Sequence, residues 1–135
     1  MTTITDLIKK LRSWDNRVVQ EAVEELRLRG WLTDGSLNKI ALCYARLEGA
    51  DLLKASLQYV DFHQASLQWA DLKMADLTGA KLTRANMQSA NLGETILKDA
   101  DLFKANLGDA RNLTDLQLSE AKRLYGSIMP DGDLY

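Results

Sequence analysis

The sequence predicts an all-β solenoid with small helical caps, in which the chain winds into stacked coils of a parallel β-helix. Large apolar residues recur at every fifth position from Leu42 to Leu107 without a break. Alanine usually stands two positions before each of them, with the bulkier Ile40 and Val60 as departures. The segments on either side lack this period and have helical patterns instead. These three observations predict a coiled middle that is closed at both ends.

The period of five excludes an ordinary helix or a straight strand over residues 40–111. On an α-helix, a step of five residues turns the side chain by about 140°, so the leucines would spiral around the axis. On a strand, an odd step places successive leucines on opposite faces. A chain that turns a corner once per repeat directs every leucine and alanine inward instead. Successive coils would stack about 4.8 Å apart, although the period alone leaves the number of sides open.

The repeats resemble those of a known family. The units ADLLK, ADLKM, ADLTG, ANLGE and ADLFK fit the pattern A-(D/N)-L-x-x, which looks like the pentapeptide repeat family. The resemblance covers residues 40–111 and implies a right-handed quadrilateral β-helix with four repeats in each coil. Residues twenty apart would then stack in columns, which gives about three and a half to four coils.

An N-terminal helical cap is expected over residues 1–37. Asp15 or Asn16 can start its second helix, and Gly30 stands where a left-handed residue ends one. The stretch AVEELRLRGWLTDGSL also resembles the helical head of some bacterial pentapeptide repeat proteins. The apolar positions that predict one face of a first helix within residues 4–14 are Ile4, Leu7, Ile8, Leu11 and Trp14.

A second cap is expected after the register breaks at Ala110. Thr114 and Gln117 form a capping-box pattern, which predicts a short helix through about Lys122. The chain is therefore divided into the cap, a β-helix over residues 38–111, and a C-terminal helix and turn over residues 112–135, all in one structural domain. Both caps are needed because a stacked coil leaves an open sheet edge at each end.

Composition restricts the class of protein. The formal net charge is −2 and the charges are evenly spread, without the basic patch of a nucleic-acid-binding protein. The N-terminus has no apolar run, which argues against a signal peptide or a membrane span. A single cysteine allows no intramolecular disulfide. These features predict a cytoplasmic protein that binds neither nucleic acid nor membrane.

No set of residues predicts catalysis, a metal site or a cofactor. His63 is the only histidine, in an outward corner position, and its expected column neighbours are Cys43 and Thr83. One cysteine and one histidine do not complete a zinc site, and a Cys–His nucleophile would also need a cleft. The repeat aspartates are expected to accept hydrogen bonds from the local backbone. The protein is therefore predicted not to be an enzyme.

Apolar residues at outward corners form a candidate interaction surface, namely Leu53, Tyr59, Trp69 and Met74. Leu53 and Met74 are expected at the same corner in neighbouring coils, with Trp69 one corner away. Scattered apolar residues are common on protein surfaces. A binding or dimer patch anchored on Trp69 is the alternative. Both interpretations stay open at this point, as do a monomer and a homodimer.

The predicted function is a non-catalytic protein–protein interaction or scaffold module with an unidentified protein partner. The family resemblance implies one alternative, because some pentapeptide repeat proteins imitate DNA and bind and protect type II topoisomerases such as gyrase. That mechanism needs a strongly negative flank, whereas residues 40–111 contain 8 basic and 9 acidic side chains. The charge pattern therefore favours the interaction module.

Overall fold

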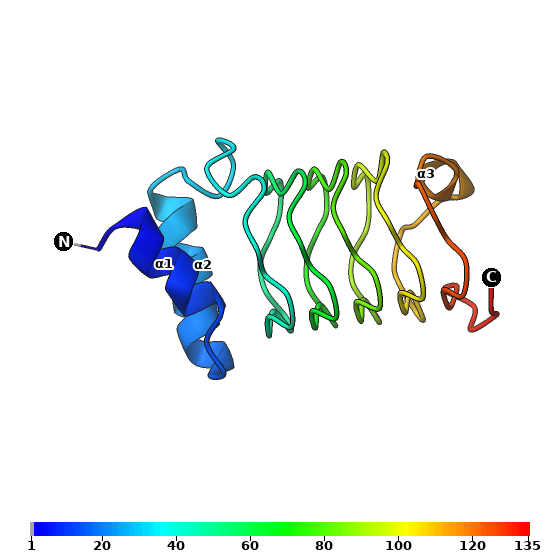
Figure 1. Ribbon diagram of the computed structural model, residues 1–135, viewed down its shortest axis with the longest axis horizontal. Helices are drawn as coiled ribbons and strands as arrows, with labels where there is room; N and C mark the ends of the chain where they lie inside the picture. Colours follow the sequence, from blue (N-terminus) through cyan, green and yellow to red (C-terminus); the bar gives the residue numbers. More distant parts are fainter. Residues whose placement is uncertain (1) are drawn as a thin grey trace.

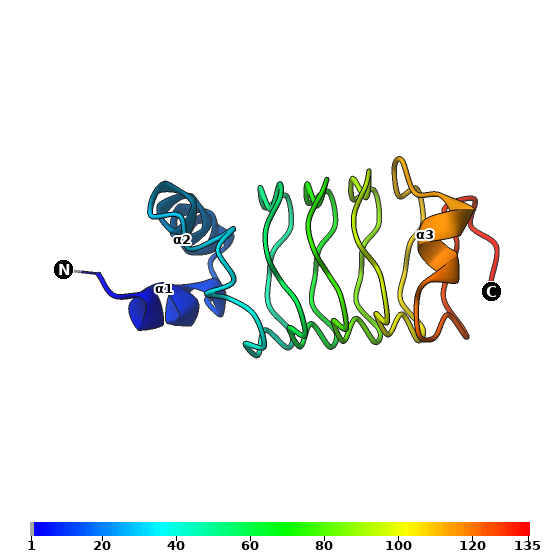
Figure 2. The same cartoon turned by 90° about the horizontal axis from the view of Figure 1, so that it is seen from above.

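The computed structural model describes residues 2–135 and shows a rod with two helices at its N-terminal end (Figure 1). The helices are α1 (Ile4–Leu11), α2 (Asn16–Leu28) and α3 (Asp115–Ser119). Between α2 and α3 the chain winds into a regular stack of coils, and α3 lies at the far end of the stack (Figure 2). The helical caps and the coiled middle therefore follow one another along a single axis.

Four repeats make one coil, because parallel bridges join residues twenty apart, from Ala41–Asp61 to Asn91–Arg111. Each bridge joins a single pair of residues, and residues 2–135 contain no longer strand. The reason is the short distance between corners, which leaves too few residues on each side for a continuous ladder. The coils are nevertheless held by backbone hydrogen bonds, such as that from the Leu42 amide to the Asp61 carbonyl at 2.7 Å.

The corners are tight turns with a left-handed residue. The Ala45 amide donates to the Leu42 carbonyl at 3.1 Å, and Tyr44 between them has a φ of 61°. This is the pattern of a type II turn. Bulky residues such as Trp69 and Met74 also adopt positive φ, although this conformation costs about 1–2 kcal/mol for a residue with a Cβ. The hydrogen bonds to neighbouring coils hold them there.

The core is a shaft of leucine and alanine along the axis of the rod. Every large apolar centre from Leu42 to Leu107 is at most 3% exposed, which confirms the inward assignment. Thr95 stands at a position where most repeats have alanine. Its buried hydroxyl is satisfied, because Oγ1 donates to the Leu72 carbonyl at 2.7 Å. Ile40 is only partly buried, since it lies where the chain enters the first coil.

Where the small polar residue of a repeat is Asp or Asn, its side chain accepts a hydrogen bond from the backbone two residues later. The carboxylate of Asp71 accepts from the Lys73 amide at 3.0 Å, and the Asn91 side chain accepts from the Gly93 amide at 3.1 Å. These bonds stabilise the start of the corner turn. The predicted role of the repeat aspartates is therefore confirmed where these bonds form.

Side chains of the N-terminal cap cover the open edge of the first coil. Arg12 Nε donates to the Ala41 carbonyl at 2.8 Å, and Gln20 Nε2 donates to the Glu48 carbonyl at 2.8 Å. Further donors to carbonyls of this coil are Asn16, to Arg46 and Glu48, and Arg27, to Asp51 and Leu53. The cap thus satisfies acceptors that a preceding coil would otherwise bind.

The first helix is shorter than the sequence pattern predicts. It ends at Leu11, and Trp14 lies in the linker to α2 with 82% of its surface exposed. The assignment of Trp14 to a buried helical face is therefore wrong. The physical reason is the start of α2, where the Asp15 side chain caps the helix by accepting from the Arg17 amide at 2.9 Å. The N-cap residue Asp15 is extended, so the helical face of α1 cannot continue into α2.

The second helix begins and ends as the sequence predicts. Asp15 is its N-cap, and Gly30 follows its end with a φ of 75°. The Trp31 amide donates to the Leu26 carbonyl at 2.9 Å, and the Gly30 amide donates to the Arg27 carbonyl at 3.0 Å. This pair of bonds is the Schellman motif.

The C-terminal segment continues the β-helix after a helical insertion. Thr114 and Gln117 form the predicted capping box, but α3 ends at Ser119, before Lys122. Parallel bridges then join Asp101 to Arg123 and Asn106 to Ile128, so the ladder extends past the boundary placed at residue 111. These partners are 22 residues apart in sequence instead of twenty, because α3 adds two residues to its side of the coil. The final residues fold back, with an antiparallel bridge between Ile128 and Leu134.

An ion pair fastens this segment to the last regular coil. Arg123 Nη2 lies 2.6 Å from Asp101 Oδ2, and Arg123 Nε donates to Oδ1 at 3.0 Å. Burial raises the pKa of the Asp101 carboxyl, but hydrogen bonds from Arg123 and the Phe103 amide, with the charges of Arg123 and Lys122, outweigh it. The net pKa lies below the ordinary value of 3.8.

Asp101→Asn is expected to lower the melting temperature at neutral pH. A carboxyl group with a lowered pKa stabilises the fold above its unfolded pKa and loses this contribution as the pH falls through its folded pKa. The difference in melting temperature between wild type and variant should therefore shrink at pH values below 3.8, the ordinary pKa of an aspartate. Thermal melting over a pH series measures it, with Asp71→Asn as a control that keeps the local backbone hydrogen bond. A difference that stays constant with pH would contradict the ion-pair explanation.

Candidate interaction surfaces

The four predicted surface residues lie on three corners of the rod. Leu53 and Met74 share one corner in neighbouring coils, where the Lys54 amide donates to the Lys73 carbonyl at 2.9 Å. Leu53 is partly buried and Met74 is 41% exposed. Trp69, at 67% exposure, lies on one adjacent corner and Tyr59, at 53%, on the other. The structure therefore brings Leu53 and Met74 together but places Trp69 and Tyr59 at opposite corners.

Tyr59 packs on the rod itself. Its aromatic ring occupies the space that a Cβ atom at Gly79 would fill, one coil further along the same corner. Gly79 has a φ of 66°, so the turn and the tyrosine ring both favour glycine there. Part of the Tyr59 side chain therefore has a structural role, which leaves Trp69 as the more prominent anchor.

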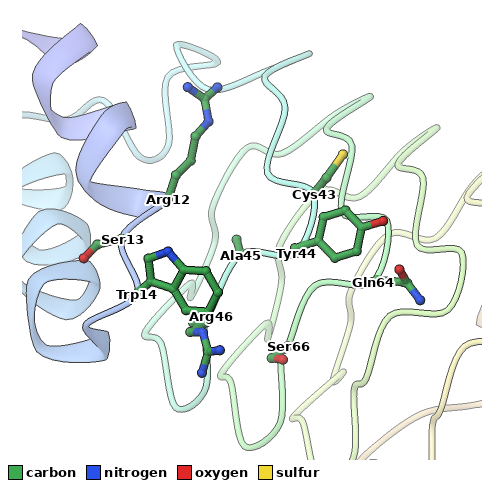
Figure 3. Close-up of a pocket in the computed structure, with 9 residues that line it drawn as sticks. All are labelled: Arg12, Ser13, Trp14, Cys43, Tyr44, Ala45, Arg46, Gln64 and Ser66. Atoms are coloured by element: carbon green, nitrogen blue, oxygen red, sulfur yellow. The ribbon is translucent and has the colours of Figure 1, made fainter.

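A pocket of about 560 Å³, here called the cap groove, separates the α1–α2 linker from the first coils. In Figure 3 the indole of Trp14 and the phenol of Tyr44 lie on either side of Ala45. The Arg46 guanidinium lies 4.6 Å from the Trp14 ring centroid, a cation–π contact. The residues that line the cap groove are Arg12, Ser13, Trp14, Cys43, Tyr44, Ala45, Arg46, Gln64 and Ser66.

Sequence reasoning missed the cap groove because its two walls come from different parts of the chain. Trp14 was expected in the core, and Arg46 occupies the repeat position where Asp, Asn or Ser is usual. Arg46 was the available signal of this surface site in the sequence, because a long cationic side chain at a position for a small polar residue must extend outward from the coil. The groove itself depends on how the cap docks, which the repeat pattern does not describe.

The single histidine and the single cysteine do not form a reactive pair. His63 Nδ1 lies 2.6 Å from Thr83 Oγ1, and the Tyr44 ring meets the imidazole edge-on at 5.7 Å. Burial raises the pKa of the Cys43 thiol, and a hydrogen bond to Asp61 and the charge of that residue add to the effect. The thiol is therefore protonated at neutral pH and is a poor nucleophile.

Two further searches concern the described part of the chain, residues 2–135. It contains no group of three or more His, Cys, Asp or Glu residues that could hold a metal ion. None of its helices combines the length and the apolar character that crossing a membrane requires.

The repeats match a known family. The matching description is Pentapeptide repeats, with 8 copies of the repeat in residues 36–73, 61–99 and 80–111. The chain belongs to the pentapeptide repeat family. This pentapeptide repeat protein has no match among curated protein sequences.

Two solved structures of pentapeptide repeat proteins are similar to this chain to different degrees. A pentapeptide repeat protein from the thylakoid lumen of Arabidopsis thaliana aligns with a TM-score of 0.62 and 24% identity, covering 73% of this chain and 68% of that chain. HetL, a pentapeptide repeat protein involved in heterocyst differentiation regulation in the cyanobacterium Nostoc, is 32% identical with a TM-score of 0.32. That alignment covers 73% of this pentapeptide repeat protein and 61% of HetL. The family and the Arabidopsis structure identify the rod as a right-handed β-helix solenoid.

Proposed function

We propose that this protein is a non-catalytic protein–protein interaction or scaffold module that acts in the cytoplasm. The observation that carries the proposal is the placement of Trp69, a large aromatic side chain with 67% of its surface exposed on a rigid corner. Its amide donates to the Gln88 carbonyl at 3.0 Å, and the turn closes through the Ala70 amide and the Leu67 carbonyl at 3.1 Å. A tryptophan on a fixed backbone loses little entropy when a partner covers it.

The surroundings of Trp69 support a partner that donates hydrogen bonds. Gln68, Gln88 and Ser89 line a shallow hollow beside the indole. Gln68 Oε1 is buried, and no residue among 2–135 donates a hydrogen bond to it. A buried acceptor without a donor is unfavourable, so rotation of the Gln68 side chain to turn this oxygen outward would let an N–H of a bound protein donate to it.

The charges and the length of the rod support this function over DNA mimicry. Bridges at a spacing of twenty residues extend over residues 41–111, from which we infer a short rod of about three and a half to four coils. Lysines interrupt the aspartates on the outer faces, as Lys81 does between Asp61 and Asp101 in one column of bridges. A continuous acidic flank is the feature that a topoisomerase would recognise.

Trp69→Ala is expected to weaken self-association or the capture of the partner protein. The melting temperature should change little, because truncating an exposed side chain usually changes stability by no more than about 0.5 kcal/mol. Sedimentation velocity measures self-association, and affinity capture from the native cell, with protein identification, measures the partner. Tyr59→Ala, at the opposite corner, is the matched aromatic control. A strictly monomeric wild type that captures no protein, or two variants that behave alike, would contradict the proposal.

A further inference from the structure

The cap groove carries positive charge in a chain whose formal net charge is −2. Its lining includes Arg12 and Arg46 and contains no carboxylate. Arg46 forms none of the ion pairs found among residues 2–135. Its guanidinium faces the Trp14 ring, so the N–H groups at the edge of the guanidinium remain available to an acceptor. The groove therefore offers an oriented cation beside an aromatic surface.

The charge pattern continues along the rod from the groove. Bridges align Arg46 with Ser66, Ser66 with Asn86, and Asn86 with Asn106, so one side of the β-helix has no carboxylate at its central outward position. We call these residues the carboxylate-free side. The bridges place aspartates at the same position on each of the other three sides: Asp51 and Asp71, Asp76, and Asp61 and Asp101. Repulsion of an anionic ligand is therefore weakest on the side that leads to the cap groove.

Neighbouring corner residues extend this cationic surface. Arg84 and Lys104 follow Tyr44 and Gln64 along the corner that borders the carboxylate-free side, as the hydrogen bonds between successive coils show. Glu48, on the other border, is engaged by Asn16, whose Nδ2 lies 3.4 Å from its carboxylate. The cations are thus distributed along the rod. One bordering carboxylate, Glu48, already has a partner in the cap, and Asp61 at the edge of the groove is hydrogen-bonded to the Cys43 thiol.

We propose that the cap groove and the carboxylate-free side bind an extended acidic peptide segment of a partner protein. Three steps between coils cover about 14 Å, which an extended peptide crosses in about five residues. Trp14 and Tyr44, 82% and 63% exposed, provide apolar surface for one aliphatic side chain of that peptide. Four cations are fewer than the roughly six to ten phosphate contacts typical of nucleic-acid binding, which favours a peptide. The inference rests on the proposed interaction function but is centred on the cap groove, which Trp69 does not line.

The test uses a fluorescein-labelled glutamate-rich peptide of about eight residues with one central leucine, a length slightly greater than the surface it should cover. Fluorescence anisotropy measures its affinity for the full chain. Arg46→Glu is expected to weaken binding by about tenfold or more, because it replaces the cation with a repelling charge. Lys54→Glu is the matched control, since it makes the same change of charge at a corner away from the carboxylate-free side. Its affinity should stay near that of wild type, and both variants are first checked for an unchanged melting temperature.

The indole N–H signals of the three tryptophans locate the bound peptide by nuclear magnetic resonance. The Trp14 signal is expected to shift, while that of Trp31, which lines neither the cap groove nor the carboxylate-free side, stays in place. The inference is overturned if wild type does not bind the peptide, if both charge variants weaken binding equally, or if the Trp14 signal stays in place. A single-stranded oligonucleotide of equal charge that binds more tightly than the peptide also overturns it, in favour of nucleic acid.

The peptide test and the test of the proposed function can fail separately. Trp69→Ala should weaken peptide binding less than Arg46→Glu does, because Trp69 borders the carboxylate-free side but does not line the cap groove. If the peptide does not bind but capture of a partner protein depends on Trp69, only the inference about the cap groove is rejected. If the peptide binds in an Arg46-dependent way but Trp69→Ala changes neither self-association nor partner capture, the cap groove is supported and the proposed Trp69 surface is rejected.

Discussion

Leu72→Lys is expected to unfold the β-helix. Leu72 is 0% exposed and lies at the centre of the rod, in the column shared by Leu52 and Leu92. Removing a buried leucine costs about 2–5 kcal/mol, and an unpaired ammonium group in the shaft adds several kcal/mol. The sum is comparable with the whole stability of a typical domain, about 5–15 kcal/mol. The lysine has no partner in a shaft of leucine and alanine, so the coils should separate.

Circular dichroism and size-exclusion chromatography measure this result. Met74→Lys is the matched control, because it introduces the same charge two residues away at a corner where the side chain is 41% exposed. The control should keep its melting transition and its elution volume. If the two variants melt alike, the leucines do not fill the core and the inward assignment is wrong.

Ala75→Leu is expected to destabilise the rod by about 1–3 kcal/mol through overpacking. Ala75 is 0% exposed and lies between Ala55 and Thr95 in a column of small residues. Two inward side chains on one side of the coil fit only if one of them is small, so a second leucine has to displace its neighbours.

Urea unfolding of Ala75→Leu measures the loss as a lower transition midpoint with an unchanged slope. Ala41→Leu is the matched control, since Ala41 is exposed on the outer surface and the added atoms face solvent. Equal midpoints for Ala75→Leu and wild type would show that the shaft has room for a larger residue, contrary to the packing described here.

The repeating part of the fold could be predicted from the sequence because one steric rule acts at every position. A chain with a period of five and paired large and small residues can bury its apolar groups in few ways. The predicted way is a coil with inward-facing leucines, and the burial of the centres from Leu42 to Leu107 confirms it. The helices of the cap are less constrained. Trp14 continues the apolar pattern of α1, yet α1 ends at Leu11 and Asp15 caps the start of α2, which leaves Trp14 in the linker between the helices.

The C-terminal side of the rod was hidden by a change of register. Arg123 and Ile128 occupy repeat positions, but α3 shifts them by two residues from the spacing of twenty. A pattern search that requires a constant period therefore stops at residue 111. Only the bridges of Asp101 and Asn106 show that the chain returns to its coil after the helix.

The candidate surfaces were harder to predict because they depend on which corners face the same direction. The sequence places Leu53 and Met74 together correctly, and the four-sided coil then separates Trp69 from Tyr59. The cap groove combines Trp14 with Arg46, whose contact is made by tertiary docking. Periodicity describes each repeat relative to its own coil and contains no information on that docking.

The hydrogen bonds between the N-terminal cap and the first coil have a consequence for assembly. Each coil presents acceptors at the spacing that the next coil needs, so an uncovered end could add another molecule and grow into a filament. The side chains of Arg12 and Gln20 donate to the carbonyls of Ala41 and Glu48. A side chain, unlike a coil, offers no further row of backbone groups on which another coil could pair. The helical cap thus blocks the stacking of a second rod on this end of the first coil.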